Sequence, residues 1–181
     1  MRQVDNFAIA APNSKTADIL LDMIDNKLKI PVKRQGYLDM YNSINVQQTR
    51  HYIKISVRLF INKVFVKHLA TWVKLAYPSP ARSTPLPSDP TFQKKFNSST
   101  GNPDKNSQLK LAKDMQIDYH SGIGELIWAM TTCWLDLAYS SIELSQSNSC
   151  PYEVHYHGLK HALKYLYHTK DNGQYFLQTE P

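Results

Sequence analysis

The stretch 118–176, DYHSGIGELIWAMTTCWLDLAYSSIELSQSNSCPYEVHYHGLKHALKYLYHTKDNGQYF, decides the fold that we expect for the rear half of this chain. Apolar residues recur in it every three or four positions, the spacing of one helix face. Three helices are predicted, at about 121–133, 135–142 and 151–169, with Ser149 and Pro151 starting the last. The residues expected on their inward faces are Ile123, Leu126, Ile127 and Met130, then Leu135, Ala138, Tyr139 and Ile142, then Leu159, Ala162, Leu163 and Leu166. A turn at 171–173 and a strand at 174–177 follow.

The part of the chain before this stretch predicts strands and helices in alternation. A buried strand is expected at 4–11, followed by a helix at 16–29 that Asn13 or Ser14 caps and Pro31 ends. The run at 38–46 and the alternation of apolar and polar residues at 52–57 predict a hairpin. Helices are expected at 59–73 and 107–116. The fold class is therefore α+β, with a small antiparallel sheet and helices in front and a helical part behind.

A proline-rich segment separates the two parts. Residues 77–106 show neither helical nor strand periodicity, and they predict a linker or an extended wrap instead of a packed element. The expected organisation is a front domain at 1–76, a linker at 77–106 and a helical domain at 107–181.

Composition narrows the classes of protein to be considered. The 181 residues carry a formal net charge of +6, with a pI of about 9.2, which suits a polyanionic partner such as nucleic acid. Two cysteines, Cys133 and Cys150, imply no disulfide framework and fit a reducing compartment. No apolar stretch is long enough to span a bilayer, and no signal peptide is visible. We therefore expect a soluble intracellular protein, cytoplasmic or nuclear, with no membrane partner.

The rear half also carries a series of residues that match one family pattern in order. These residues are Tyr119, Ser121, Ile123, Gly124, Leu126, Asp136, Leu137, Ala138, Ser145, Pro151, His155, Tyr165, Leu166, Thr169, Asp171 and Gly173. The pattern is that of the region following the palm in copia-type LTR retrotransposon reverse transcriptases, which this chain resembles over nearly its whole length. Trp134 and Leu135 stand where the family has arginine and proline. The resemblance implies a partial reverse-transcriptase palm and then a helical thumb or connection-like part, with a ribonuclease H domain expected beyond it.

The resemblance also gives an interpretation of the first residues of the chain. Val4 and Asp5 match the Tyr-Val-Asp-Asp box of the family, with Gln3 in place of the tyrosine. The resemblance therefore implies that Asp5 is a catalytic aspartate that binds the metal, and that Mg²⁺ is the cofactor. Asn6 stands in place of the second aspartate, which removes an anionic ligand, so we expect no productive Mg²⁺ binding.

Two further sets of residues are predicted to contact nucleic acid. The first is primer-grip-like by resemblance and consists of Tyr41, Asn42, Ser43 and Ile44. Ser43 replaces a glycine of the family, which is expected to stiffen the backbone or block its close approach. The second set consists of basic residues suited to phosphate contact. They are Lys33 and Arg34, then Lys54, Arg58, Lys63 and Lys67 in the hairpin and the helix after it, and Lys160 and Lys164 in the last helix. Solvated helix faces explain these basic residues as well, so both interpretations stay open.

Histidines and cysteines give weaker signals. Glu153, His157 and His161 share one helix face at a spacing that can hold zinc, with His155 nearby. No fourth ligand is evident, so a polar helix face is the preferred interpretation. Neither cysteine has a partner for thiol catalysis, and no small-molecule cofactor is expected.

Three hypotheses follow for the function. The leading one is a fragment of a copia-type reverse transcriptase, of RNA-directed DNA polymerase ancestry, with an RNA or DNA primer–template as its implied partner. We expect it to be inactive alone, because Asn6 replaces a metal ligand and the upstream palm would lie before Met1. The alternative is a non-catalytic nucleic-acid-binding module that uses the basic surface. The third is a polypeptide without selected function, marginally folded because its palm strands lack their neighbours.

Overall fold

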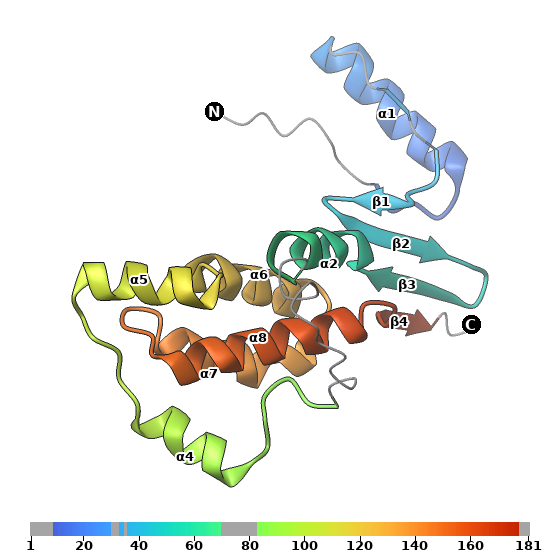
Figure 1. Cartoon of the computed structure of the whole chain (residues 1–181). Helices are drawn as coiled ribbons and strands as arrows, with labels where there is room; N and C mark the ends of the chain where they lie inside the picture. Colours follow the sequence, from blue (N-terminus) through green and yellow to red (C-terminus); the bar gives the residue numbers. More distant parts are fainter. Residues whose placement is uncertain (1–8, 30–32, 35, 70–82, 178–181) are drawn as a thin grey trace. The chain divides into compact units, whose positions relative to one another are not determined.

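The computed structural model describes residues 9–29, 33–34, 36–69 and 83–177 of the chain (Figure 1). It is an α+β structure of helices and a small antiparallel sheet with the strand order β1-β2-β3-β4, which confirms the predicted fold class at this level. The chain divides into two compact units, Met1–Tyr41 and Asn42–Pro181. This boundary lies between β1 and β2, whereas the sequence predicted a division within 77–106.

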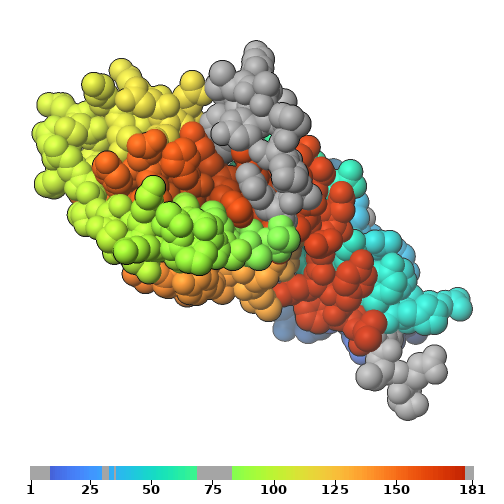
Figure 2. Space-filling view, turned by 60° about the horizontal axis from the view of Figure 1, so that its bottom comes forward, coloured from blue at the N-terminus to red at the C-terminus, as the bar shows by residue number. Residues whose placement is uncertain are grey.

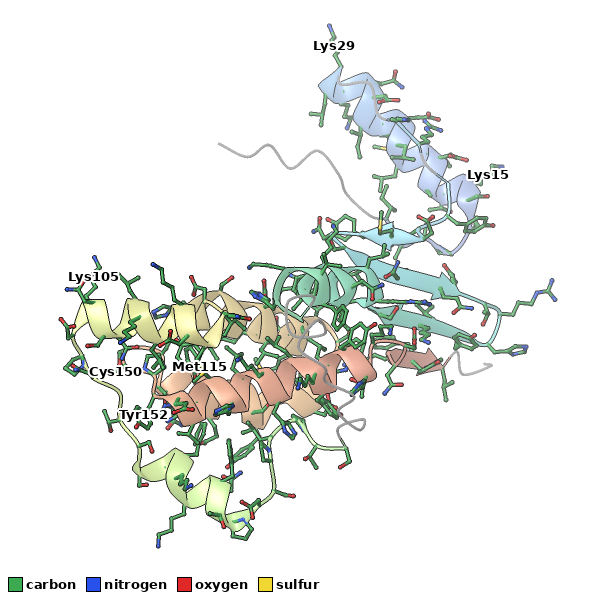
Figure 3. All side chains as sticks on the ribbon, in the orientation of Figure 1. Lys15, Lys29, Lys105, Met115, Cys150 and Tyr152 are labelled. Carbon is green, nitrogen blue, oxygen red and sulfur yellow. The ribbon has the colours of Figure 1, made fainter. Side chains whose placement is uncertain are left out.

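The first unit contains helix α1 (Ser14–Leu28) and ends with the short strand β1 (Met40–Tyr41). Asn13 caps α1 by accepting a hydrogen bond from the Thr16 amide at 2.9 Å, which confirms one of the two predicted caps. Lys15 and Lys29 mark the two ends of α1 in Figure 3, and no α1 residue is buried. Most of the strand predicted at 4–11 lies outside the described residues, and residues 9–11 do not form a strand.

The sheet of the second unit contains β2 (Ile44–Gln48), β3 (Tyr52–Ser56) and β4 (Gln174–Leu177). β2 and β3 form the predicted antiparallel hairpin, in which Val46 lies opposite Ile55. β4 is the predicted final strand, and it pairs antiparallel with β3 so that Tyr175 lies opposite Lys54. The last described strand of the chain therefore returns to the hairpin of the front part.

A helix follows β3, as predicted, but its geometry changes halfway. α2 (Arg58–Val64) is an α-helix, and η1 (Phe65–Leu69) is a π-helix. Val57, Ile61 and Val64 are buried in the core. Phe65 stacks on Tyr167 of α8 (Glu153–His168), with ring centroids 3.7 Å apart. The end of the predicted helix, 70–73, lies outside the described residues.

The predicted linker contains a packed helix, so the expectation that 77–106 lacks packed structure is wrong for residues 83–106. α4 (Pro90–Ser98) has Asp89 as its N-cap and Pro90 as its first residue. Phe96 of α4 is buried, as is Leu86 before it. Figure 2 shows α4, in green, lying along α8, in orange-red, and residues of the two helices are in contact. Proline at the first helical position promotes a helix because its fixed φ suits the first turn, so a proline-rich composition does not exclude one.

The helical core of the second unit is built mainly from α6 (Tyr119–Thr132), α7 (Ala138–Gln146) and α8, with α5 (Lys105–Met115) beside them. These helices confirm the predictions at 107–116, 121–133 and 151–169 within a few residues. The hydrophobic residues with no exposed surface in this core are Leu126, Ala129, Leu137, Leu144, Leu159, Ala162 and Leu166. Met115 at the end of α5, labelled in Figure 3, is also buried.

The predicted inward face of 135–142 is wrong. A 3₁₀ turn, η2 (Leu135–Leu137), precedes α7, and Leu135 in it is 68% exposed. Tyr139 and Ile142 are exposed as well. The buried residues of this region are Leu137, Ser140, Ser141 and Leu144. Ser140 can be buried because its hydroxyl donates to the Leu137 carbonyl oxygen at 2.9 Å, which satisfies the donor.

The start of α8 also differs from the predicted one. Tyr152, and not Ser149, occupies the N-cap position, and its amide donates to His155 Nδ1 at 2.8 Å. His155 Nε2 lies 3.2 Å from the carbonyl oxygen of Phe96 in α4. A neutral imidazole with its proton on Nε2 satisfies both contacts. Burial lowers the pKa of His155, which favours this neutral form, so the ring ties α4 to the start of α8.

Candidate nucleic-acid interface

Positive charge is concentrated in one segment of the second unit. Residues 42–69, which we call the cationic segment, include no aspartate or glutamate. Its five basic residues are Arg50, Lys54, Arg58, Lys63 and Lys67. The segment comprises β2, β3, α2, η1 and the turns between them. The segment therefore contains no negative side chain that would repel an approaching polyanion.

The β2–β3 turn presents the first of these cations. The Thr49 hydroxyl accepts hydrogen bonds from the amides of His51, at 3.2 Å, and Tyr52, at 3.1 Å. It also donates to the Tyr52 carbonyl oxygen at 3.1 Å. These bonds fix the turn, and Arg50 lies within it with an exposed side chain. Arg50 is thus held at the tip of the hairpin.

Asp171, in the turn before β4, contacts two other cations. Lys54 donates to the Asp171 carbonyl oxygen at 3.0 Å, and Arg58 Nε lies 3.2 Å from the Asp171 carboxylate. Both partners of the second contact are mostly exposed, so water weakens it and a phosphate group can compete for the guanidinium. Lys63 is exposed on α2, and it has no ion pair with another described residue. The segment therefore offers several accessible cations.

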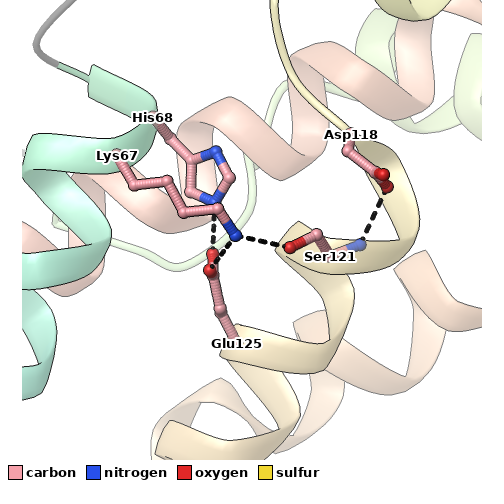
Figure 4. Close-up of polar contacts among 5 residues, drawn as sticks. All are labelled: Lys67, His68, Asp118, Ser121 and Glu125. Carbon is pink, nitrogen blue, oxygen red and sulfur yellow. Dashed lines mark hydrogen bonds and ion pairs between the residues drawn. The ribbon is translucent and has the colours of Figure 1, made fainter.

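Lys67, the last cation of the segment, belongs to a polar network (Figure 4). Its ammonium group donates to Glu125 Oε1 at 2.8 Å and to Ser121 Oγ at 2.6 Å. Glu125 Oε2 lies 2.5 Å from Nε2 of His68, whose side chain is buried. Asp118 caps α6 by accepting from the Ser121 amide at 3.0 Å. The network joins η1 to the first two turns of α6.

The geometry of this network is suited to holding η1 against α6, and it is not suited to nucleophilic catalysis. Burial alone would raise the pKa of Glu125, but hydrogen bonds from His68 and Lys67, with their charges, hold the pKa below its usual value. Glu125 therefore stays ionised and keeps both neighbours engaged. The Ser121 hydroxyl accepts from the Lys67 ammonium, and no base among the described residues contacts it to activate it.

The cysteines are also unsuited to catalysis. Both are free, and burial raises the pKa of the Cys133 thiol to about 12. This thiol is protonated at neutral pH and is a poor nucleophile. Cys150 donates its thiol hydrogen to the Gly101 carbonyl oxygen at 2.8 Å, so it has a structural contact.

The residues predicted for catalysis, Asp5 and Asn6, lie outside the described residues. The assignment of Asp5 as a Mg²⁺ ligand therefore stays a prediction. Within the ranges that the structure describes, no group of three or more His, Cys, Asp or Glu side chains comes together as a metal site.

The histidine face of α8 is polar, and its members have separate partners. His157 Nε2 lies 3.4 Å from Glu153 Oε1 at the exposed start of the helix. His161 Nε2 lies 2.9 Å from the Thr84 carbonyl oxygen. These contacts match the preferred interpretation of a polar helix face.

The predicted primer-grip-like residues form a tight turn between strands. β1 ends at Tyr41, Asn42 and Ser43 form the turn, and β2 begins at Ile44. The φ angles of Asn42 and Ser43 are 48° and 66°, in the left-handed region that favours glycine and asparagine. A glycine would adopt the φ angle of Ser43 at lower cost than serine does, so the backbone of this turn is strained locally.

The basic residues predicted to contact phosphate outside the cationic segment lie in two different units: Lys33 and Arg34 in the first, Lys160 and Lys164 in the second. Arg34 forms ion pairs with Asp18, at 3.1 Å, and with Asp22. The hydrogen bond to Asp22 raises the pKa of Arg34. Burial lowers the pKa of Lys160, whose ammonium lies 3.9 Å from the Met115 sulfur. Arg34 and Lys160 are thus less accessible to phosphate than Arg50 or Lys63.

Two features of this interface were missed from the sequence. The Lys67–Glu125–His68 network joins residues more than fifty positions apart, and no local pattern indicates it. The absence of acidic residues from 42–69, by contrast, is visible in the sequence once charges are counted segment by segment.

An open depression of about 680 Å³ lies where α4 meets the start of α8. Its lining includes Phe92, Tyr152 and His157, together with Lys95 and Glu153 of opposite charge. Because charges of both signs face it and it is open to solvent, we assign it no ligand.

Comparisons with protein-family models, with curated proteins and with solved structures found no match to this chain. In the described part of the chain, no helix has the length and apolar character needed to cross a membrane.

Proposed function

We propose that this chain is a fragment of a copia-type reverse transcriptase that binds an RNA or DNA primer–template without extending it. The order of motifs in 118–176 supports the ancestry, and Asn6 at the position of a metal ligand supports the loss of polymerase activity. The observation that carries the binding is the cationic segment, with its five basic and no acidic residues. The binding does not depend on the ancestry, because the same surface would serve a non-catalytic nucleic-acid-binding module of any origin.

Counterion release sets the size of the expected effect. Arg50, Lys54, Arg58 and Lys63 are the cations available for phosphate, because Lys67 is held by Glu125 and Ser121. Four phosphate contacts predict a slope of log K against log salt of roughly −3 to −4, or about a 100-fold loss of affinity between 50 and 200 mM salt. Such a dependence would distinguish this surface from a solvated face without a ligand.

Reversing charge in the cationic segment should weaken binding to a duplex. We expect Arg50→Glu with Lys63→Glu to lower affinity for a fluorescent primer–template at least about 10-fold and to reduce the salt slope by about two. The matched control is Lys105→Glu with Lys110→Glu, which changes net charge equally through two exposed residues of α5. Equal losses in the two variants would show that net charge alone governs binding, and binding indifferent to salt would contradict the proposal.

Polymerase activity should be absent. Two-metal phosphoryl transfer needs several carboxylates to hold two divalent ions, and Asn6 is neutral where the family has an aspartate. A primer-extension assay with Mg²⁺ should therefore show no template-dependent incorporation of nucleotides, while primer–template binding persists in EDTA. Template-dependent extension by the purified chain would overturn this part of the proposal.

A further inference from the structure

We propose that the outer face of the β2–β3–β4 sheet binds unpaired nucleotides, with bases stacking on Tyr175 and Tyr52 beside Lys54. This inference rests on the proposed binding of nucleic acid, and it names the form of nucleic acid that this face selects, a single strand.

The register of the strands defines this outer face. Ile44 and Ile55 pack against the hydrophobic core, so the side chains on their side of the sheet are the inner ones. Because side chains alternate along a strand, Tyr52 and Lys54 project from the opposite face. Tyr175 lies directly opposite Lys54 in the register, so it shares that outer face. The three side chains come from two neighbouring strands whose positions the backbone pairing fixes.

The rings of this face are held in a fixed arrangement. Tyr52 and Tyr175 form an edge-to-face pair with centroids 5.4 Å apart and planes at 61°. The Lys54 ammonium lies 5.2 Å from the centroid of the Tyr175 ring, within reach of a cation–π contact. Tyr175 nevertheless keeps 55% of its surface exposed. An ordered aromatic ring that remains accessible, with a cation beside it, has the properties of a base-stacking site.

The chemistry of this face favours a single strand over other ligands. Bases in a duplex already stack on each other, so an exposed ring can stack only on bases that are unpaired. The same hairpin carries Arg50 at its tip, and the backbone of a single strand supplies the phosphates to meet it. A purely apolar protein partner would offer no anionic group to the exposed cations Arg50 and Lys63.

The test compares two adjacent aromatic residues of β4. Phe176 is exposed to nearly the same extent as Tyr175, at 52%, but lies on the other face of the sheet. In the full chain, Tyr175→Ala should lower affinity for a fluorescent 12-mer of oligo(dT) by about 5- to 150-fold, the range measured for loss of one stacked base. Affinity for a blunt duplex should stay the same, and Phe176→Ala should leave both affinities unchanged.

Two further variants at position 175 separate stacking from packing. Tyr175→Phe keeps the ring and should retain binding, whereas Tyr175→Leu keeps apolar volume without a ring and should lose it. Equal effects of Tyr175→Ala and Phe176→Ala, or equal loss of single-strand and duplex affinity, would overturn the inference. If duplex binding remains salt-dependent while Tyr175→Ala has no effect, the inference fails and the proposed function stands. If the unaltered chain binds neither probe at low salt, both fail.

Discussion

Leu137→Ala is expected to lower the free energy of unfolding by about 2–5 kcal/mol, the range for truncating a fully buried leucine. Leu137 has no exposed surface and belongs to η2, the turn that packs between α6 and α7. The loss has two contributions. The removed methyl and methylene groups no longer gain free energy by leaving water, and a cavity remains because the surrounding helices relax only partly into the space. Urea unfolding followed by circular dichroism would measure it.

Leu135→Ala is the matched control, since it makes the same chemical change two residues earlier in the same turn. Leu135 is 68% exposed, so its truncation should change stability by no more than about 0.5 kcal/mol. Together, the two variants show which face of residues 135–142 is buried. A large loss for Leu135→Ala with a small one for Leu137→Ala would restore the face predicted from apolar spacing and contradict the structure.

Local signals explain what could be predicted from the sequence. The α1 helix follows from an Asn13 cap and apolar residues at helical spacing, and the β2–β3 hairpin follows from alternation at 52–57. Both depend on residues close to each other in the chain. Such elements form wherever the pattern is strong, and their boundaries came within a few residues.

The face of α7 could not be found in this way because apolar residues lie on both of its sides. Spacing selected Tyr139 and Ile142, which are exposed, whereas Ser140 and Ser141 are buried against the other helices. Small side chains let helix backbones approach, and only the shape of the neighbouring helices decides which side fits. Hydrophobicity alone does not carry this information.

The packed helix within 77–106 was missed for a different reason, because the sequence does contain a helix-start signal there. Asp89 followed by Pro90 is an N-cap and first-turn pair, and Asp89 accepts from the Phe92 amide at 2.8 Å. The high proline content outweighed this signal in the sequence-based prediction. Proline breaks a helix only in its interior, so its position matters more than its frequency.

The candidate site depends on contacts that no local pattern encodes. Tyr52 and Tyr175 meet only because β4 pairs with β3, and Lys67 meets Glu125 only because η1 packs beside α6. Several residues that match the family pattern lie in the core and not at the candidate site. Tyr119, Leu126 and His155 are buried, so this part of the pattern describes how the helices pack. These three residues therefore serve the packing of the helices and do not line a binding surface.

Gly101→Ala is expected to destabilise the second unit by about 1–3 kcal/mol, the cost of inserting an atom into a packed site. Gly101 lies between α4 and α5, and its amide donates to the Cys150 carbonyl oxygen at 3.1 Å. A Cβ atom there would lie 2.2 Å from the Pro151 carbonyl oxygen, which is backbone and cannot rotate away. The loop would have to leave the segment before α8, which would also break the Cys150 thiol contact to Gly101.

Gly124→Ala is the control for this substitution, and it should act in the opposite direction. Gly124 lies inside α6, and a Cβ atom at this position meets no atom within 4 Å. Alanine restricts the unfolded chain and suits a helix interior, so we expect a gain of about 0.5–1 kcal/mol. Gly124 belongs to the family pattern and Gly101 does not, so conformity to that pattern would predict the reverse order of the two effects. Thermal unfolding of the two variants therefore shows whether close packing or agreement with the family pattern governs stability at these glycines. A loss of stability for Gly124→Ala larger than that for Gly101→Ala would contradict the packing described for this loop.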